Sequence, residues 1–211
     1  GDVLIDGISV TNLPIHLRAR KGIGLLPQEP SVFKGLSVLD NLKTACELQH
    51  TLATKRDKDE RIEKLLIQFG LKEIEERRGK FLSGGEKRRL ELARLLVSSP
   101  RYVLLDEPFA GVDPLSINEI KGHISSLAQD NIGVLINDHN AKDLLDVCDN
   151  VFVMNDGTII FEGKPEEVAA NEDVRSVYLG NWKQLQNGVE EGEIKSLSSK
   201  EQKNRAEFGK T

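Results

Sequence analysis

Two adjacent carboxylates follow an apolar run in the middle of the chain, in the sequence Leu104-Leu105-Asp106-Glu107-Pro108. An apolar strand that ends in Asp-Glu places both side chains at the carboxyl edge of a parallel sheet, where open α/β folds bind ligands. In phosphate chemistry such an aspartate holds Mg²⁺ and such a glutamate polarises an attacking water. A strand that merely ends in two solvated acids would have the same sequence, so this pair alone does not distinguish a catalytic site from an ordinary strand end.

The second candidate is the sequence Leu82-Ser83-Gly84-Gly85-Glu86. Ser-x-x-Glu is also a capping box, which starts many ordinary helices. A capping box does not need two glycines, however, and each costs a helix about 1 kcal/mol relative to alanine. Glycines are expected where a ligand approaches the backbone, and the free N–H groups of a helix start bind anions. We therefore interpret this segment as an anion-binding helix start.

Two single residues complete the candidate set. His139 comes just after the apolar run of residues 133–136, at the predicted edge that also carries Asp106 and Glu107, which suggests a role near a γ-phosphate. Gln28 lies at a strand-to-loop junction, after Leu26-Pro27. A lone histidine is usually structural or merely exposed, and a lone glutamine carries no signal by itself.

The hydrophobic pattern indicates which elements hold these residues. Apolar runs predict strands at residues 3–5, 22–26, 102–105, 133–136, 151–154 and 158–161. The strands at 102–105 and 133–136 are expected to be buried on both faces. Helical spacing, caps and prolines predict helices over residues 55–69, 83–98 and 140–147, and from Ser37, Asp113 and Pro165 onward. The alternation predicts an α/β fold whose mainly parallel sheet is wrapped by helices.

Residues 37–94 contain predicted helices and no predicted strand, so they are expected to form an inserted helical subdomain. The predicted division is then a first part of the core in residues 1–36, the insertion, the rest of the core in residues 95–185, and a tail in residues 186–211. That tail is rich in Glu, Lys, Ser, Gln and Asn, which predicts disorder.

Composition excludes several classes. With 211 residues, 38% apolar and 30% charged, the chain fits a soluble domain with a real core. Its longest apolar runs are far shorter than the roughly 20 residues of a membrane-spanning helix. A net charge of −5 and a pI near 5.5 argue against nucleic acid as a partner. Cys46 and Cys148 lie far apart without metal-type spacing, which is typical of reduced thiols in a cytosolic protein.

In their order and spacing the candidates resemble the nucleotide-binding subunits of ABC transporters. The resemblance covers about residues 1–185 and rests on motifs in the family's order, namely Gln28 (Q-loop), Leu82-Ser83-Gly84-Gly85-Glu86 (signature), Tyr102–Asp106 (Walker B), Glu107 (catalytic glutamate), Ala110-Gly111-Val112-Asp113 (D-loop) and His139 (switch histidine).

This resemblance implies a P-loop NTPase-like fold, the cofactors ATP and Mg²⁺, and two copies of the chain arranged head to tail. Each ATP would lie between the Walker motifs of one copy and the signature of the other. The family's roles then fall on the following residues: Glu107 as general base, His139 on the γ-phosphate and water, Asp106 and Gln28 on Mg²⁺ and water, Ser83, Gly84, Gly85 and Glu86 on the partner's ATP, and Asp113 at the dimer seam.

Within the family, several segments resemble the ATPases of lipopolysaccharide exporters, namely residues 16–29, 31–34, 36–38, 107–114, 138–140 and 177–180. That implies integral membrane subunits as partners and a cytoplasmic location, peripheral on the inner face of the membrane. Phe33 is the candidate for lining the groove that receives a helix of each membrane subunit, or else it is a helical-core residue. Two alternatives stay open: the ATPase of a branched-chain amino acid importer, and a non-catalytic partner that supplies only the signature face.

One family motif is missing from the printed sequence. The only Gly-Lys-[Ser/Thr] triplet is Gly209-Lys210-Thr211, and Asn204 stands where the phosphate-binding motif G-x-x-x-x-G-K-[ST] requires its first glycine. We interpret the sequence as an N-terminally truncated form of a complete ATPase. As printed, it is expected not to hydrolyse ATP, because the electrostatic clamp on the phosphates is absent.

Overall fold

The computed structural model describes residues 1–48 and 54–174, and the predicted tail of residues 186–211 lies outside them. Contacts divide the chain into two compact units, of which the first is Gly1–Val147 and the second begins at Cys148. All of the candidate site residues belong to the first unit.

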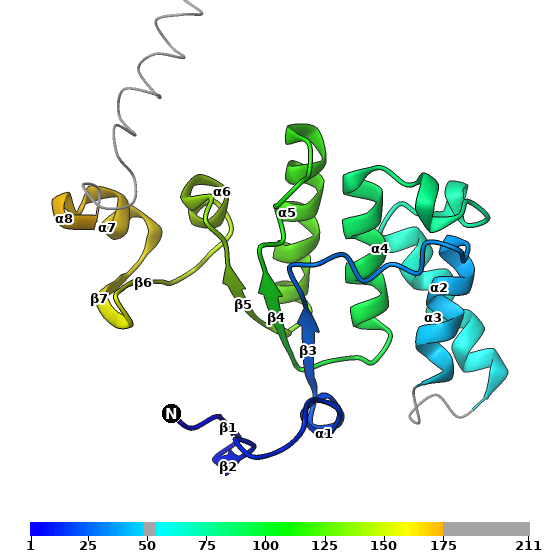
Figure 1. The fold of residues 1–211 in the computed structure, drawn as a ribbon, viewed down its shortest axis with the longest axis horizontal. Coiled ribbons are helices and arrows are strands. Elements are labelled where there is room, and N and C mark those ends of the chain that lie inside the picture. The colour runs from blue at the N-terminus through cyan, green and yellow to red at the C-terminus, as the bar shows by residue number, and fades with distance from the viewer. Residues whose placement is uncertain (49–53, 175–211) are drawn as a thin grey trace, which may run out of the picture. The chain divides into compact units, whose positions relative to one another are not determined.

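A three-stranded parallel sheet organises the first unit (Figure 1). Its strands lie in the order β3 (Ile23–Leu26), β4 (Tyr102–Asp106) and β5 (Gly133–Asn137). Both pairings are parallel, so the carboxyl ends of all three strands meet at one edge. The predicted parallel sheet and α/β class are therefore confirmed. An antiparallel pair, β1 (Leu4–Ile5) and β2 (Ile8–Ser9), and helix α1 (Ile15–Arg20) precede the sheet.

Within the described residues the strands are covered on one face only, which corrects the prediction that β4 and β5 are buried on both faces. Val103 and Leu105 are 1% and 2% exposed and pack with α4 (Gly84–Leu96) and α5 (Pro114–Gln129) in the core. Leu25 and Leu135, whose side chains alternate to the other face, are 44% and 60% exposed. The apolar run therefore reflects core packing on one face and an open apolar surface on the other.

Helices alone occupy the described part of residues 38–96, without a strand among them. They are α2 (Val38–Glu47), α3 (Lys55–Gln68), the short 3₁₀ turns η1 (Lys72–Ile74) and η2 (Gly79–Phe81), and α4. Ser37 caps α2 as predicted, by accepting a hydrogen bond from the Asp40 amide. The division of the core from this stretch at residues 36 and 94 stays a prediction.

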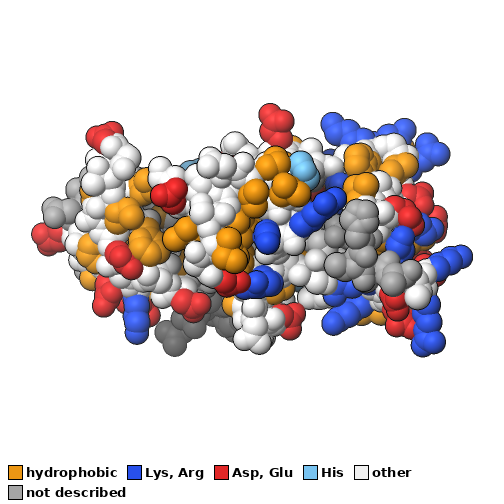
Figure 2. Space-filling view, turned by 90° about the horizontal axis from the view of Figure 1, so that it is seen from below, with side chains coloured by type: hydrophobic (Ala, Val, Ile, Leu, Met, Phe, Trp, Pro, Cys, Tyr) orange, Lys and Arg blue, Asp and Glu red, His pale blue; other side chains and the backbone are white. Residues whose placement is uncertain are grey.

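Helix α3 shows why this stretch is helical. The residues at its predicted apolar positions are buried, with exposed fractions of 0–4%; they are Ile62, Leu65, Leu66 and Phe69. Its outer face carries charged pairs such as Arg56–Glu60 at 2.7 Å. Figure 2 shows both signs of charge interspersed over this end of the first unit, as expected for a solvated helical face.

After β5 comes the short helix α6 (Ala141–Leu145), which Asn140 caps. The second unit begins with a hairpin of β6 (Val151–Asn155) and β7 (Thr158–Gly163). Asp156 and Gly157 in its turn have φ of 47° and 75°, the left-handed values that such a tight turn requires, which confirms the predicted hairpin. Helices α7 (Pro165–Ala170) and α8 (Glu172–Val174) follow. No helix in the described ranges has both the length and the apolar character that crossing a bilayer requires.

Candidate nucleotide site at the carboxyl edge of the sheet

Glu107 lies at the centre of the edge, directly after β4. Gln28, from the loop after β3, donates its side-chain amide N–H to Oε2 of Glu107 at 2.9 Å. His139, from the loop after β5, places Nδ1 3.5 Å from Oε1 of the same carboxylate. Three segments that are far apart in the sequence thus meet at one carboxylate, as the strand order demands.

The backbone of Glu107 is held in a left-handed conformation, with φ of 46°. Such a φ is uncommon outside glycine and costs about 1–3 kcal/mol, so the surrounding structure must hold it. The Glu107 amide donates to the Asn137 carbonyl at 2.7 Å. The turn that carries the candidate base is therefore fixed to the neighbouring strand.

Asp106 lies opposite Asn137 in the β4–β5 register. The Asn137 side-chain amide donates to Oδ1 of Asp106 at 3.0 Å and so orients the carboxylate. No group of three His, Cys, Asp or Glu side chains that could enclose a metal occurs in the described ranges. A carboxylate oxygen and the amide oxygen of Gln28 nevertheless fit Mg²⁺, which takes few protein ligands and keeps several waters.

Asp138 is a supporting residue that the sequence analysis missed. Its side chain is 1% exposed, and it accepts hydrogen bonds from the Phe109 amide at 3.2 Å and the Asn140 amide at 2.8 Å. It thereby joins the turn after β4 to the loop that carries His139, whose own side chain is 71% exposed. An acid between a polar strand end and a histidine gives no periodicity signal, so only the structure reveals this role.

The start of α4 is the second candidate region. Ser83 Oγ accepts from the Glu86 amide at 3.2 Å, and Oε2 of Glu86 accepts from the Ser83 amide at 2.8 Å, so the capping box is real. Arg77 holds the other oxygen of Glu86 at 2.8 Å. Ser83 and Gly84 are exposed, so the helix start opens onto the surface of the unit.

The two glycines have a packing role that the sequence analysis did not foresee. A Cβ on Gly84 would lie 2.6 Å from the Gly111 carbonyl oxygen, and one on Gly85 would lie 2.3 Å from Oγ of Ser116. Close approach of α4 to Gly111 and to the first turn of α5 therefore requires glycine at both positions, whatever ligand the helix start meets. Asp113 caps α5 in this segment, and the hydrogen bonds from the Ser116 side chain and main chain lower the pKa of its carboxyl.

The comparisons with known proteins agree with this geometry. A family model described as "ABC transporter" matches residues 1–110. The lipopolysaccharide export system ATP-binding protein LptB of Haemophilus influenzae is 46% identical over 180 residues, which cover 85% of this chain and 74% of that protein. This chain belongs to the ABC transporter ATP-binding proteins. A second family model, for a branched-chain amino acid ATP-binding cassette transporter, matches residues 158–181.

Solved ABC structures share the fold. CbiO1 of Clostridium perfringens, described as part of the ABC transporter complex cbiONQ, superposes with a TM-score of 0.72 at 29% identity, over 85% of this chain and 72% of that one. The ADP conformation of MJ1267, another ATP-binding cassette of an ABC transporter, superposes with a TM-score of 0.71 at 27% identity, over 85% of this chain and 77% of that one. These matches confirm the predicted fold class and family. The ABC ATPases as a family bind and hydrolyse ATP.

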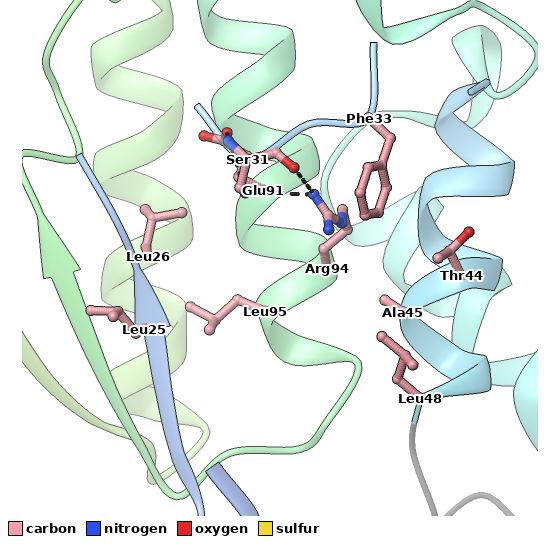
Figure 3. A pocket seen from close by; sticks show the side chains of 10 residues that line it. All are labelled: Leu25, Leu26, Ser31, Phe33, Thr44, Ala45, Leu48, Glu91, Arg94 and Leu95. Carbon is pink, nitrogen blue, oxygen red and sulfur yellow. Dashed lines mark hydrogen bonds between the residues drawn. The ribbon is translucent and has the colours of Figure 1, made fainter. Parts of the chain in front are cut away.

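This ABC ATPase also carries a groove between the edge of the sheet, α2 and α4 (Figure 3). Its lining residues are Leu25, Leu26, Ser31, Phe33, Thr44, Ala45, Leu48, Glu91, Arg94 and Leu95. Phe33 lines the groove and is 44% exposed, so it is not a core residue.

Two neighbours hold Phe33 in this groove. The guanidinium of Arg94 stacks 4.6 Å from the Phe33 ring centroid, and burial lowers the pKa of Arg94. The Asn41 side chain fixes the Phe33 main chain by accepting from its amide at 2.9 Å. These contacts hold the ring at the groove.

Proposed function

We propose that this chain is the ATP-hydrolysing subunit of a lipopolysaccharide exporter. The observation that carries the proposal is the meeting of Gln28 and His139 at the Glu107 carboxylate, on the sheet edge where α/β folds bind ligands. Likeness to the LptB proteins supports the transported substrate, since these are the relatives at 44–46% identity.

Glu107 is the general base. It takes a proton from the water that attacks the γ-phosphate, while Gln28 and His139 orient that water and the phosphate. Bound Mg²⁺ supplies charge neutralisation on the phosphate oxygens. Asp106 and Gln28 would hold it, with Asn137 orienting the Asp106 carboxylate.

A second copy of the chain completes each site. Ser83, Gly84, Gly85 and Glu86 would face the ATP that the partner copy holds, because the start of α4 is open to the surface and its N–H groups favour an anion. Asp113 lies beside this start, against which Gly111 of the D-loop and Ser116 of α5 pack. This position supports assigning Asp113 to the proposed dimer seam.

Integral membrane subunits are the other partners, which would place the protein on the inner face of the cytoplasmic membrane. Their docking site is the groove of Figure 3, and Phe33 is its aromatic anchor. Truncating a buried aromatic anchor typically costs about 2 kcal/mol or more of binding free energy. We predict that Phe33→Ala reduces copurification with the membrane subunits, whereas Phe152→Ala, which removes an exposed ring of β6, does not. Equal recovery of both variants would contradict the groove assignment.

A branched-chain amino acid importer is the second candidate, favoured by the family match over residues 158–181. The two are separated by reconstituting the full-length gene product with its membrane subunits. Stimulation of ATP turnover by lipopolysaccharide supports export, and stimulation by branched-chain amino acids with their binding protein supports import.

We also propose that residues 1–211 alone do not turn over ATP, because they contain no G-x-x-x-x-G-K-[ST] motif. Turnover is therefore measured on the full-length gene product.

The experiment for the catalytic assignment is Glu107→Gln in that complex. General-base catalysis contributes about 10²–10⁴-fold, so turnover should fall by that factor while the affinity for ATP is retained. Unchanged turnover would refute the role of Glu107. It would also favour the remaining alternative, a non-catalytic subunit that offers only its signature face.

A further inference from the structure

One buried ion pair in the first unit has no catalytic role above, although its glutamate also lines the groove of Figure 3. Arg88 and Glu91 lie one turn apart on α4, and each is 4% exposed. Nη1 of Arg88 lies 3.2 Å from Oε2 of Glu91. A buried pair of this kind seldom adds stability over apolar side chains of similar size, so its presence calls for another explanation.

Arg88 spends its other donors on main-chain carbonyls that bracket the site. Its Nη2 donates to the Glu107 carbonyl at 2.6 Å and its Nε to the Pro108 carbonyl at 2.9 Å. Its Nη1 also donates to the Pro27 carbonyl at 3.3 Å. One guanidinium therefore joins the residue before Gln28 to the turn that carries Glu107.

Glu91 extends the connection into the loop after Gln28. Its Oε1 accepts from the Ser31 amide at 2.5 Å, while Oε2 faces Arg88. Both flanks of Gln28 are thus fixed to α4, and the Gln28–Glu107 hydrogen bond of 2.9 Å spans the interval between them.

The left-handed backbone of Glu107 needs such support. Asn137 holds its amide from the β5 side, and Arg88 holds its carbonyl from the α4 side. Without the second hold, the strained turn can relax and swing the carboxylate away from Gln28 and His139. A displacement of about 1 Å in a reacting group can cost about 100-fold in rate.

We infer that Arg88 and Glu91 are a positioning pair for the general base: they fix the Glu107 turn and the Gln28 loop to α4, and so set the geometry of the carboxylate. The inference rests on the proposed role of Glu107. It concerns no contact of Arg88 with ATP, so it predicts an effect on kcat and little effect on KM.

The test replaces both partners, Arg88→Met with Glu91→Met, because removing one alone would strand a buried charge. In the full-length complex we expect kcat to fall by about 10- to 100-fold with KM for ATP within about twofold. Arg88→Lys keeps the charge but loses the forked set of donors, so its kcat should also fall. This variant replaces the double variant in the test if the double variant does not fold. The control is Arg89→Met with Glu119→Met, which removes the 2.9 Å ion pair between the next residue of α4 and α5 and should leave kcat unchanged.

A mutant cycle with Glu107→Gln separates positioning from a general structural defect. If the pair acts through Glu107, adding its substitutions to Glu107→Gln should lower single-turnover rates by less than about twofold further. Two results would overturn the inference. One is a further 10- to 100-fold loss of rate when the Arg88 and Glu91 substitutions are added to Glu107→Gln. The other is an unchanged kcat when they are made in the protein that retains Glu107. If Glu107→Gln itself leaves turnover unchanged, the proposed function fails first, so the two failures are distinguishable.

Discussion

The sheet edge and the start of α4 both carry residues predicted to meet a triphosphate, yet they differ in how far one chain completes them. At the edge, three segments of the same chain converge on the Glu107 carboxylate. At the start of α4, Ser83 and Glu86 cap each other across a single turn, and Ser83 remains exposed. The edge is assembled by the folding of one chain, whereas the helix start is open to the surface, where we propose that a second chain brings its ATP.

The two regions are nevertheless joined inside one chain. Helix α4 begins at the exposed signature and, one turn later, places Arg88 on the Glu107 carbonyl. The glycines at its start also press against Gly111 and Ser116 near the D-loop. One helix therefore connects the surface proposed to meet the partner copy to the turn that holds the proposed base.

The largest difference between the two regions is expected from a change at Ser83. Ser83→Asp keeps a good N-cap, so the melting temperature should hardly change. It places a carboxylate before the partner's triphosphate, and losing a favourable contact to transition-state charge costs about 10²–10³-fold in turnover. ATPase assays and thermal melts on the same preparation check this. Normal turnover would mean that the helix start is only a structural cap.

A smaller effect is expected at the sheet edge itself, from Asn137→Ala. Removing the donor that orients Asp106 should raise the Mg²⁺ concentration for half-maximal turnover by about 10-fold, since outer-shell partners tune metal affinity by about 10–100-fold. Turnover at saturating Mg²⁺ should change little. A Mg²⁺ titration that matches the parent would contradict the role of the Asn137 hydrogen bond in orienting Asp106 for the metal.

The smallest effect concerns stability alone. Gly85→Ala should destabilise the fold by about 1–3 kcal/mol, because its Cβ would meet the Ser116 side chain. Adding Ser116→Gly removes that obstacle, so the two changes together should cost less than their sum in urea unfolding. Strict additivity would show that α4 and α5 adjust without this contact.

Local sequence patterns predicted much of this molecule. The helix starts at Ser37, Ser83 and Asp113 each have the capping hydrogen bond that their residue types favour. Strand ends predicted the meeting of His139 with Glu107, because parallel strands finish at one edge. These features depend on neighbours in sequence or on topology, which patterns carry directly.

What the sequence analysis missed depends on packing between distant segments. Arg88, within Glu-Lys-Arg-Arg, reads as an exposed helical charge, yet it is buried on carbonyls about 20 and 60 residues away. The open face at Leu135 was missed because an apolar run does not state how many faces are covered. Gly85 needs its size for Ser116, a contact that no local rule reveals.

The central claim is that each ATP site takes Glu107 from one chain and Ser83 from the other. It is tested most directly with mixed dimers of the full-length gene product, isolated through two affinity tags, that carry one copy each of Glu107→Gln and Ser83→Asp. With the two changes in different chains, one site stays whole and ATP turnover should persist. With both changes in the same chain, each site loses one half and turnover should fall to the Glu107→Gln level. The reverse result would show that each chain forms its site alone, and would contradict the account.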